Sequence, residues 1–285
     1  MAWTERGALA FACAVVMVVL SAVAVALRLV SRGRILRILG PTDWFMVLTL
    51  FFSTLTTIGV GVHVTYGLGR HITDFSPDEL ATFFKVVYIS VIVNGISLVL
   101  TKASVLLLFL DIIVITWIRK ATYVVTALVA CYGVWLTASN IFFCIPVQSF
   151  WDSSIPEKRC IPSALKGYLD AGVNLALDVV IFCLPLPIVG SLRLPRRQKL
   201  WLSLVFALGS FVCVASIVRF RFLDYQLILR DPTWGGVDII CWSTVEINVS
   251  IIIACIPTLR PLVAKLYPRL LDSPPSSETG SGGSN

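Results

Sequence analysis

Residues 165–191 read LKGYLDAGVNLALDVVIFCLPLPIVGS, and this stretch decides how the rest of the chain must fold. It is apolar enough to span a bilayer, yet it carries Asp170, Asn174 and Asp178. At about 100° per residue these three side chains fall on one face of a helix. A carboxylate at mid-bilayer depth costs at least about 2.5–3.5 kcal/mol. This face must therefore meet other helices, a partner charge or a wet cavity, which predicts a bundle of membrane helices with a polar interior.

The composition of the whole chain indicates the same class of protein. Of its 285 residues, 57% are hydrophobic and 14% are charged, and the mean hydropathy is +0.89. The apolar residues come in blocks of about 20, the length that crosses roughly 30 Å of hydrocarbon. The net charge is +7. Because the basic residues lie between the apolar blocks, they indicate membrane topology and argue against nucleic-acid binding.

We expect an all-α fold, a seven-transmembrane helix bundle with the N-terminus outside and the C-terminus cytosolic. The basic loop after the first span contains Arg28, Arg32, Arg34 and Arg37, and such loops face the cytosol. An AVAVA run at 22–26 resembles a signal-peptidase site, but the length of the apolar run favours a membrane helix. The membrane domain covers 1–270, and a disordered tail is expected at 271–285. The predicted spans are 8–30, 43–63, 82–112, 121–144, 165–191, 200–223 and 237–260.

The loop between the fourth and fifth spans carries a candidate disulfide. Cys144 and Cys160 flank it, and in the expected orientation it faces an oxidising compartment. Closing a loop of about 15 residues contributes roughly 3 kcal/mol in the chain-entropy model. The alternative is two unlinked thiols. The other cysteines of the eight lie mostly inside apolar segments, where they are expected to act as small packing residues.

The candidate catalytic residues are Asp178 and Glu246, both expected near mid-bilayer depth. Arg219 is their expected partner. Asp43 and Lys102 are expected to form a separate ion pair or helix cap between the second and third spans. The candidate substrate-binding residues, which line one cavity open to the outside if the bundle closes in the usual way, are Asp170, Asn174, Arg219, Trp242, Lys85 and His63.

Three interpretations of this interior remain open. In the first, the buried charges form a network that only orients the helices. In the second, a desolvated carboxylate protonates an alkene, epoxide or carbonyl of a hydrophobic substrate. In the third, the cavity recognises a ligand without chemistry. No metal site is predicted, and the two histidines, His63 and His71, offer no Ser-His-Asp arrangement.

The order of several short motifs resembles the fungal rhodopsin-like integral membrane proteins, including the satratoxin-cluster membrane proteins and the membrane core of Pth-eleven-like receptors. The resemblance covers about residues 28–266. The motifs that carry it are Arg28 with its basic loop, Asp43-Trp44, Gly67-Leu68-Gly69-Arg70-His71, Lys102-Ala103-Ser104, Phe143-Cys144-Ile145-Pro146 with Trp151 and Cys160, Asp178 before Leu184-Pro185-Leu186-Pro187, Gly209 before Arg219, and Glu246 before Pro257-Thr258-Leu259-Arg260-Pro261.

The resemblance implies a seven-helix fold and a frequent association with fungal secondary-metabolite genes. Retinal is not expected, because the last span has no interior lysine for a Schiff base, and no other cofactor is predicted. We expect a multi-pass protein of the endoplasmic reticulum or plasma membrane that acts on or with a small hydrophobic intermediate, as a membrane-embedded acid/base cyclase or isomerase. The expected partners are the lipid bilayer, this metabolite, and pathway enzymes or a G protein. The alternatives are a sensor like a G-protein-coupled receptor and, less favoured, a transporter. The lack of an extracellular cysteine-rich domain and of a long cytosolic tail disfavours the sensor.

Overall fold

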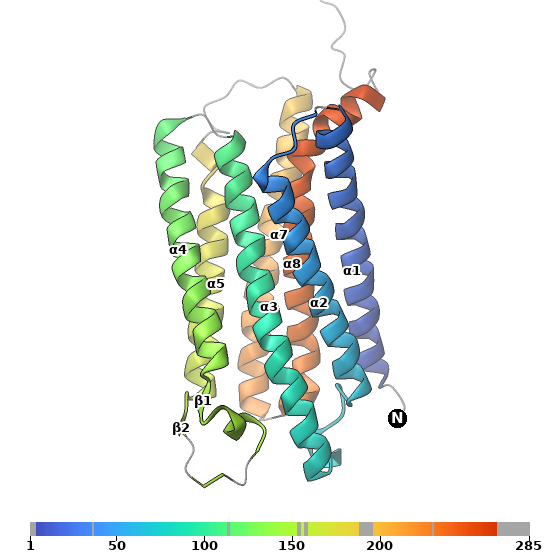
Figure 1. Cartoon of the computed structure of the whole chain (residues 1–285), viewed down its shortest axis with the longest axis vertical. Coiled ribbons are helices and arrows are strands. Elements are labelled where there is room, and N and C mark those ends of the chain that lie inside the picture. Colours follow the sequence, from blue (N-terminus) through green and yellow to red (C-terminus); the bar gives the residue numbers. More distant parts are fainter. Residues whose placement is uncertain are drawn as a thin grey trace, which may run out of the picture.

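The computed structural model describes residues 4–35, 37–112, 115–152, 155–156, 159–187, 196–229 and 231–266. Within these ranges the chain is an all-α bundle, as predicted (Figure 1). The tail expected at 271–285 lies outside the described residues. The long helices are α1 (Glu5–Val30), α2 (Pro41–Thr65), α3 (Pro77–Ile112), α4 (Thr116–Ile141), α5 (Ser163–Cys183), α7 (Arg196–Leu229) and α8 (Pro232–Leu266).

Apolar and polar side chains are distributed between surface and interior as in a membrane protein. Large apolar side chains point outward, with Leu9 and Val134 each 73% exposed. Polar side chains lie inside, and Arg28 and Asn174 are fully buried. By length and composition, five helices of the described residues can cross a membrane, namely those within Glu5–Arg34, Pro41–Thr65, Pro77–Asp111, Thr116–Ile141 and Thr233–Leu259. The all-α membrane bundle is therefore confirmed, while the count of seven crossings and the orientation stay predictions.

The helices follow one another around the bundle. Neighbouring pairs in the sequence pack together, α8 closes the ring by packing on α1, and α3 packs on α8 across the middle. Close approach of α3 and α4 depends on glycine: a Cβ on Gly133 would lie 2.7 Å from a methyl of Val99. Such small residues let backbones approach in membrane bundles.

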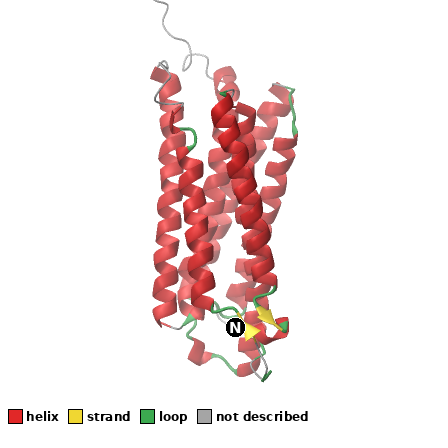
Figure 2. Cartoon of the chain, turned by 90° about the vertical axis from the view of Figure 1, so that its left-hand side faces the viewer, coloured by secondary structure: helices red, strands yellow, loops and turns green. Residues whose placement is uncertain are grey.

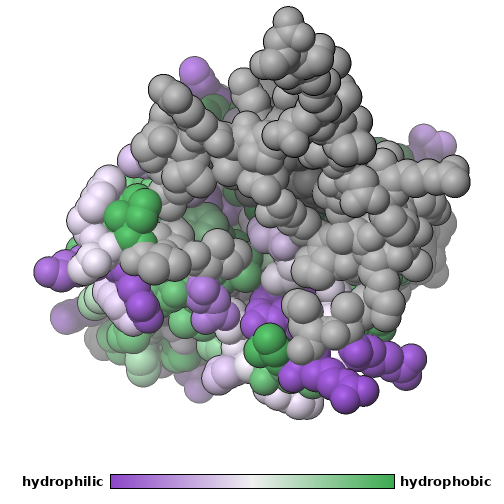
Figure 3. All heavy atoms as spheres, turned by 90° about the horizontal axis from the view of Figure 1, so that it is seen from above, coloured by the Kyte–Doolittle hydropathy of each residue, from purple (hydrophilic) through white to green (hydrophobic). Residues whose placement is uncertain are grey.

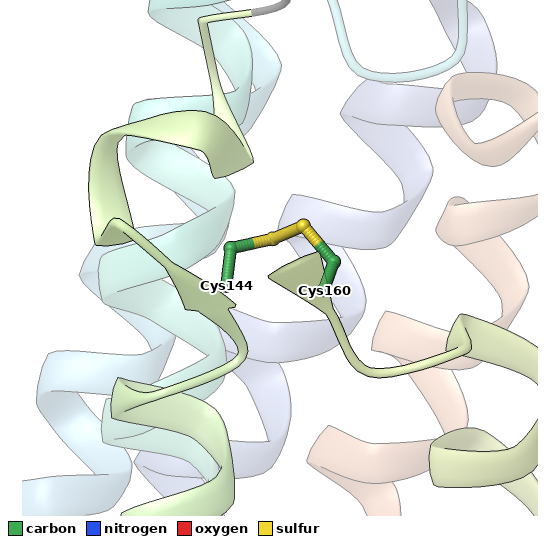
Figure 4. Close-up of a disulfide and its surroundings, with 2 residues drawn as sticks. All are labelled: Cys144 and Cys160. Atoms are coloured by element: carbon green, nitrogen blue, oxygen red, sulfur yellow. A yellow bond between two sulfur atoms is a disulfide. The ribbon is translucent and has the colours of Figure 1, made fainter. Parts of the chain in front are cut away.

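One end of the bundle, here called the disulfide end, holds the N-terminus and a small hairpin (Figures 1 and 2). Strands β1 (Cys144–Ile145) and β2 (Arg159–Cys160) pair antiparallel, with Cys144 opposite Cys160. The predicted Cys144–Cys160 disulfide is present and joins the two strands (Figure 4). It closes the connection that leads from α4 into α5.

The opposite end carries hydrophilic side chains around its periphery (Figure 3). There Asp43 caps α2 by accepting a hydrogen bond from the Gly40 N–H at 3.0 Å, as expected. Its other oxygen accepts from Arg28 Nε at 2.9 Å and lies 3.3 Å from Arg32. The predicted Asp43–Lys102 ion pair is wrong. Asp111 of α3 accepts a hydrogen bond from Thr42, the neighbour of Asp43, so Asp43 lies at the level of Asp111. Lys102 precedes Asp111 by nine residues, which places Lys102 about 13 Å farther into the bundle along α3.

Candidate functional site

Six buried side chains from four helices meet in the middle of the bundle. We call this group the central polar cluster. Each member is at most 8% exposed. α3 contributes Lys102, α5 contributes Asn174 and Asp178, α7 contributes Ser216 and Arg219, and α8 contributes Glu246.

Asp178 is held by three donors. Lys102 Nζ donates to its Oδ1. Asn174 Nδ2 and Ser216 Oγ donate to its Oδ2 at 3.1 and 2.8 Å. An ionised carboxylate only accepts hydrogen bonds, so this environment fits the charged form of Asp178. These hydrogen bonds connect Asp178 of α5 to α3 and α7.

Glu246 is less completely held. Its Oε1 accepts from Asn174 Nδ2 at 2.8 Å and lies 3.9 Å from Lys102 Nζ. Its Oε2 lies 3.4 Å from Arg219 Nε, but it is buried without a hydrogen-bond partner among the described residues. The prediction that Arg219 lies beside an interior carboxylate thus agrees with the geometry at Glu246. The partner of Asp178 is instead Lys102.

The charges of the central polar cluster balance. Two carboxylates face one lysine and one arginine, each at ion-pair distance. Pairing offsets much of the cost of burying charge, and removal of one partner leaves an uncompensated charge worth about 3–5 kcal/mol. The network therefore fixes the relative positions of α3, α5, α7 and α8.

A second ion pair lies nearer the disulfide end. Lys166 donates to Asp170 one turn later on α5 and to Asn140 Oδ1 of α4 at 2.6 Å. Tyr132 OH donates to the carbonyl oxygen of Asp170 at 3.0 Å. The other carboxylate oxygen of Asp170, Oδ1, is buried and has no hydrogen-bond partner in the described part of the chain.

Two adjacent cavities occupy the interior at the disulfide end. The Arg219 cavity has a volume of about 280 Å³, and its polar lining includes Lys166, Asp170 and Arg219. The His63 cavity has a volume of about 270 Å³ and is lined mainly by apolar residues of α3 and α8 around His63. The two cavities share the lining residues Val91, Asn94, Leu223, Ile239 and Ser243. We refer to the pair as the long cavity.

A smaller cavity of about 80 Å³ touches the central polar cluster from the other side. Lys102 and Asp178 line it, together with apolar residues that include Phe109, Phe182 and Ile253. Arg219 lines the long cavity instead. Asn174 and Glu246 line none of the three cavities. The cluster therefore separates the long cavity from this smaller one.

The predicted site residues fall into three places. Asp178, Glu246, Asn174 and Arg219 come together in the central polar cluster. Asp170, Arg219 and His63 line the long cavity. Lys85 is exposed, and neither it nor Trp242 is among the residues that line the long cavity.

The sequence predicts Arg219 beside an interior carboxylate, but it does not predict the roles of Lys166, Lys102 and Ser216. Lys166 lies four residues before Asp170, so it extends the Asp170, Asn174 and Asp178 face by one turn, and that spacing was a usable signal. The sequence predicts Asp43 as the partner of Lys102, whereas in the structure Lys102 donates to Asp178. Ser216 carried no signal, because an apolar helix gives no reason to single out one serine. Among the described residues, no group of three His, Cys, Asp or Glu side chains could hold a metal ion.

The fold and this interior define a multi-pass helical membrane protein with a charged core and an internal cavity. The model of the fungal rhodopsin domain matches residues 27–265. The chain therefore belongs to the fungal rhodopsin family, which confirms the resemblance seen in its motifs.

Three relatives illustrate the range of the family. Receptor GIN3 of Arthrobotrys oligospora is 26% identical over 269 residues, which cover 94% of this chain and 65% of the relative. A SAT4 family membrane protein of Emericella nidulans is 31% identical over 198 residues, 68% of this chain and 50% of the relative. The polyenoic acids biosynthesis gene cluster protein Ba17b of Metarhizium anisopliae is 26% identical over 261 residues, 87% of this chain and 71% of the relative. This chain thus spans about half to two-thirds of the first two relatives. No solved structure matches it.

Proposed function

We propose that this protein is a membrane component of a fungal secondary-metabolite pathway that holds a small hydrophobic intermediate in the long cavity. The observation that carries the proposal is the cavity itself, a mostly apolar space with a few polar groups at its margins. Such a lining is typical of small-molecule sites. Relatives named for biosynthesis clusters, such as Ba17b, support the pathway assignment.

The chemistry that fits this site best is cofactor-independent isomerisation or cyclisation. A carboxylic acid gives its proton to an alkene, epoxide or carbonyl of the substrate, and the double bond shifts or a ring closes. A proton from a neighbouring carbon then returns to the carboxylate, so no co-reactant is consumed. Of the two candidate acids, we assign this role to Glu246 in its protonated form, because its Oε2 has no hydrogen-bond partner among the described residues. Glu246 lines none of the three cavities, so the role requires the Arg219 side chain, which lies between Glu246 and the long cavity, to move aside. Asp178 is occupied by three donors.

A receptor-like sensor is the second candidate. The name of Receptor GIN3, which aligns over 94% of this chain, favours it. In that case the same cavity binds a signal molecule, the central polar cluster only orients the helices, and a G protein is the expected partner at the cytosolic face. The N-terminus outside and residence in the endoplasmic reticulum or plasma membrane belong to both proposals.

Metabolite profiling of a deletion strain separates these functions. The strain is complemented with wild type, Glu246→Gln, Asp178→Asn or the cavity-filling variant Ser243→Phe, and protein levels are checked. Ser210→Phe is the matched control, because Ser210 is exposed on α7. If the protein is an enzyme, a precursor accumulates in the deletion strain. Wild type and Ser210→Phe then remove this precursor, whereas Glu246→Gln and Ser243→Phe do not.

Other outcomes are equally informative. If Glu246→Gln clears the precursor and Ser243→Phe does not, binding is needed without acid chemistry at Glu246. If Ser243→Phe also restores the wild-type profile at normal protein level, the long cavity is not the site and the proposal is wrong.

A further inference from the structure

We infer that the ligand of the long cavity is an uncharged carbonyl compound, and that its carbonyl oxygen accepts hydrogen bonds from Arg219. This inference rests on the proposed function, because it assumes that the cavity holds a hydrophobic molecule. It adds the chemical class of that molecule, which follows from the accessible polar atoms on the cavity wall that have no partner among the described residues.

Arg219 supplies the most demanding of these atoms. It lines the Arg219 cavity, and its Nε faces Glu246 Oε2 at 3.4 Å. No described residue accepts a hydrogen bond from its terminal nitrogens Nη1 and Nη2, and both atoms keep accessible surface, in contrast to the fully buried Asp170 Oδ1 and His63 Nδ1. A guanidinium has five N–H donors and no acceptor. A ligand that packs against this part of the wall must therefore present an acceptor.

Two further donors lie on the wall that the two cavities share. Asn94 of α3 and Ser243 of α8 line both cavities. The polar atoms of these two side chains have no hydrogen-bond partner within the described ranges, and they too keep accessible surface. An amide and a hydroxyl can each donate to an oxygen. Three helices thus present donors to the long cavity.

The charges around the cavity favour an uncharged ligand. Each ionised side chain here already has a partner of opposite sign: Arg219 has Glu246, and Lys166 has Asp170. A ligand carboxylate would add a negative charge that nothing balances. Uncompensated charge is costly in a low-dielectric interior, so an acid fits this wall less well than a neutral acceptor.

The acceptors on the wall favour a carbonyl over an alcohol. The proton of an alcohol needs an acceptor of its own. The one carboxylate that lines the Arg219 cavity, Asp170, does not offer a free oxygen, because its Oδ1 is fully buried and its Oδ2 already accepts from Lys166. A carbonyl oxygen accepts from Arg219 and leaves no proton to place.

The remaining wall matches a hydrocarbon body. The apolar residues of the Arg219 cavity come from α3, α4, α7 and α8 and include Val91, Leu98, Leu136, Leu223 and Ile239. The His63 cavity adds aromatic rings of α3, those of Phe83 and Phe84. Apolar walls with a few placed polar groups are typical of small-molecule sites. The ligand class that fits is a ketone, ester or lactone with a mainly apolar skeleton.

The test uses the full-length protein in lipid nanodiscs and a photoreactive probe, methyl undecyl ketone with a mid-chain diazirine. Four unlabelled competitors of similar length are compared at equal mole fraction in the bilayer: the ketone, the corresponding secondary alcohol, tridecane, and dodecanoate at a pH at which it is ionised. Labelled residues are mapped by mass spectrometry. We expect labelling at lining residues of α3, α7 or α8, blocked by Ser243→Phe but not by Ser210→Phe.

The ranking of the competitors reports the ligand class. A hydrogen bond from a charged donor predicts that the ketone competes about tenfold better than tridecane, or more. The alcohol and dodecanoate should each compete less well than the ketone.

Arg219→Lys is the decisive variant. A lysine reaches only to the position of the arginine Cζ, so it keeps a cation for Glu246 and removes both terminal nitrogens. The ketone should then lose most of its advantage over tridecane, while competition by tridecane itself stays unchanged. Arg221→Lys is the matched control, because Arg221 is exposed on the same helix, and it should leave the advantage intact. The double variant Arg219→Met with Glu246→Gln keeps the charges balanced and should give the same loss. Thermal unfolding midpoints establish that each variant is folded.

Four results overturn the inference. If the ketone and tridecane compete equally at a site that Ser243→Phe blocks, the cavity binds apolar molecules without recognising a carbonyl, and the proposed function stands without this inference. If the alcohol or dodecanoate competes better than the ketone in wild type, the ligand class is wrong. If the ketone keeps its full advantage in both folded Arg219 variants, Arg219 is not the donor. If no labelling is blocked by Ser243→Phe, both the inference and the proposed site are wrong.

Discussion

Replacement of Lys102 by methionine tests the central polar cluster directly. Methionine keeps much of the side-chain length but removes the cation that donates to Asp178 and lies 3.9 Å from Glu246. Two buried carboxylates then share one cation, Arg219. Because Asp178 is 7% and Glu246 2% exposed, bulk water replaces little of the lost interaction. We expect a loss of about 3–5 kcal/mol, the range for breaking a buried ion pair.

The assay is the free energy of unfolding in mixed micelles, followed by tryptophan fluorescence. The matched control is Lys85→Met, because Lys85 is an exposed residue of the same helix; it should change stability by less than about 0.5 kcal/mol. The double variant Lys102→Met with Asp178→Asn removes both charges and should recover at least half of the loss. If Lys102→Met costs less than about 1 kcal/mol, or if the double variant is no more stable than the single one, the two residues do not form a buried ion pair.

Three further predictions concern other parts of the bundle. Gly133→Ala places a Cβ 2.7 Å from a methyl of Val99, so overpacking should destabilise the protein by about 1–3 kcal/mol. Gly172→Ala is the control, because nothing lies within 4 Å of its added Cβ, and it should not destabilise the protein. Equal thermal unfolding midpoints for the two variants would count against close α3–α4 packing. Cys144→Ser should lower the free energy of unfolding by roughly 3 kcal/mol, because the bridge spans 16 residues, and a reducing agent should destabilise wild type but not the variant. Partial burial raises the pKa of Asp231, but hydrogen bonds from His71, Thr233 and the Trp234 N–H outweigh this effect and hold the pKa below its ordinary value. The stability that Asp231 contributes is therefore present above the ordinary Asp pKa of about 3.9 and is lost as the pH falls through the lower pKa of the folded state. Asp231→Asn should flatten this part of the curve of stability against pH, and an unchanged curve would contradict the prediction.

The sequence by itself determined the class of the fold. Three local properties are enough for this: the length of each apolar segment, the basic loops and the polar face of α5. Each can be recognised in the sequence without knowledge of the neighbouring helices. The disulfide was also readable, because two cysteines flanked a loop expected to face an oxidising compartment, and the structure joins them. The same information was enough to recognise the family.

Tertiary structure alone decided which charge neutralises which. The sequence gives the position of a residue along its helix, but not the rotation of that helix or the offset of its neighbour. The sequence therefore predicts Asp43 as the partner of Lys102, although Lys102 lies deeper in the bundle and donates to Asp178. Likewise Lys85 was expected in the cavity but is exposed, whereas Lys166 and Ser216 turn inward to Asp170 and Asp178. Because a buried ion pair depends on atomic distances between separate helices, only the packed bundle determines its partners.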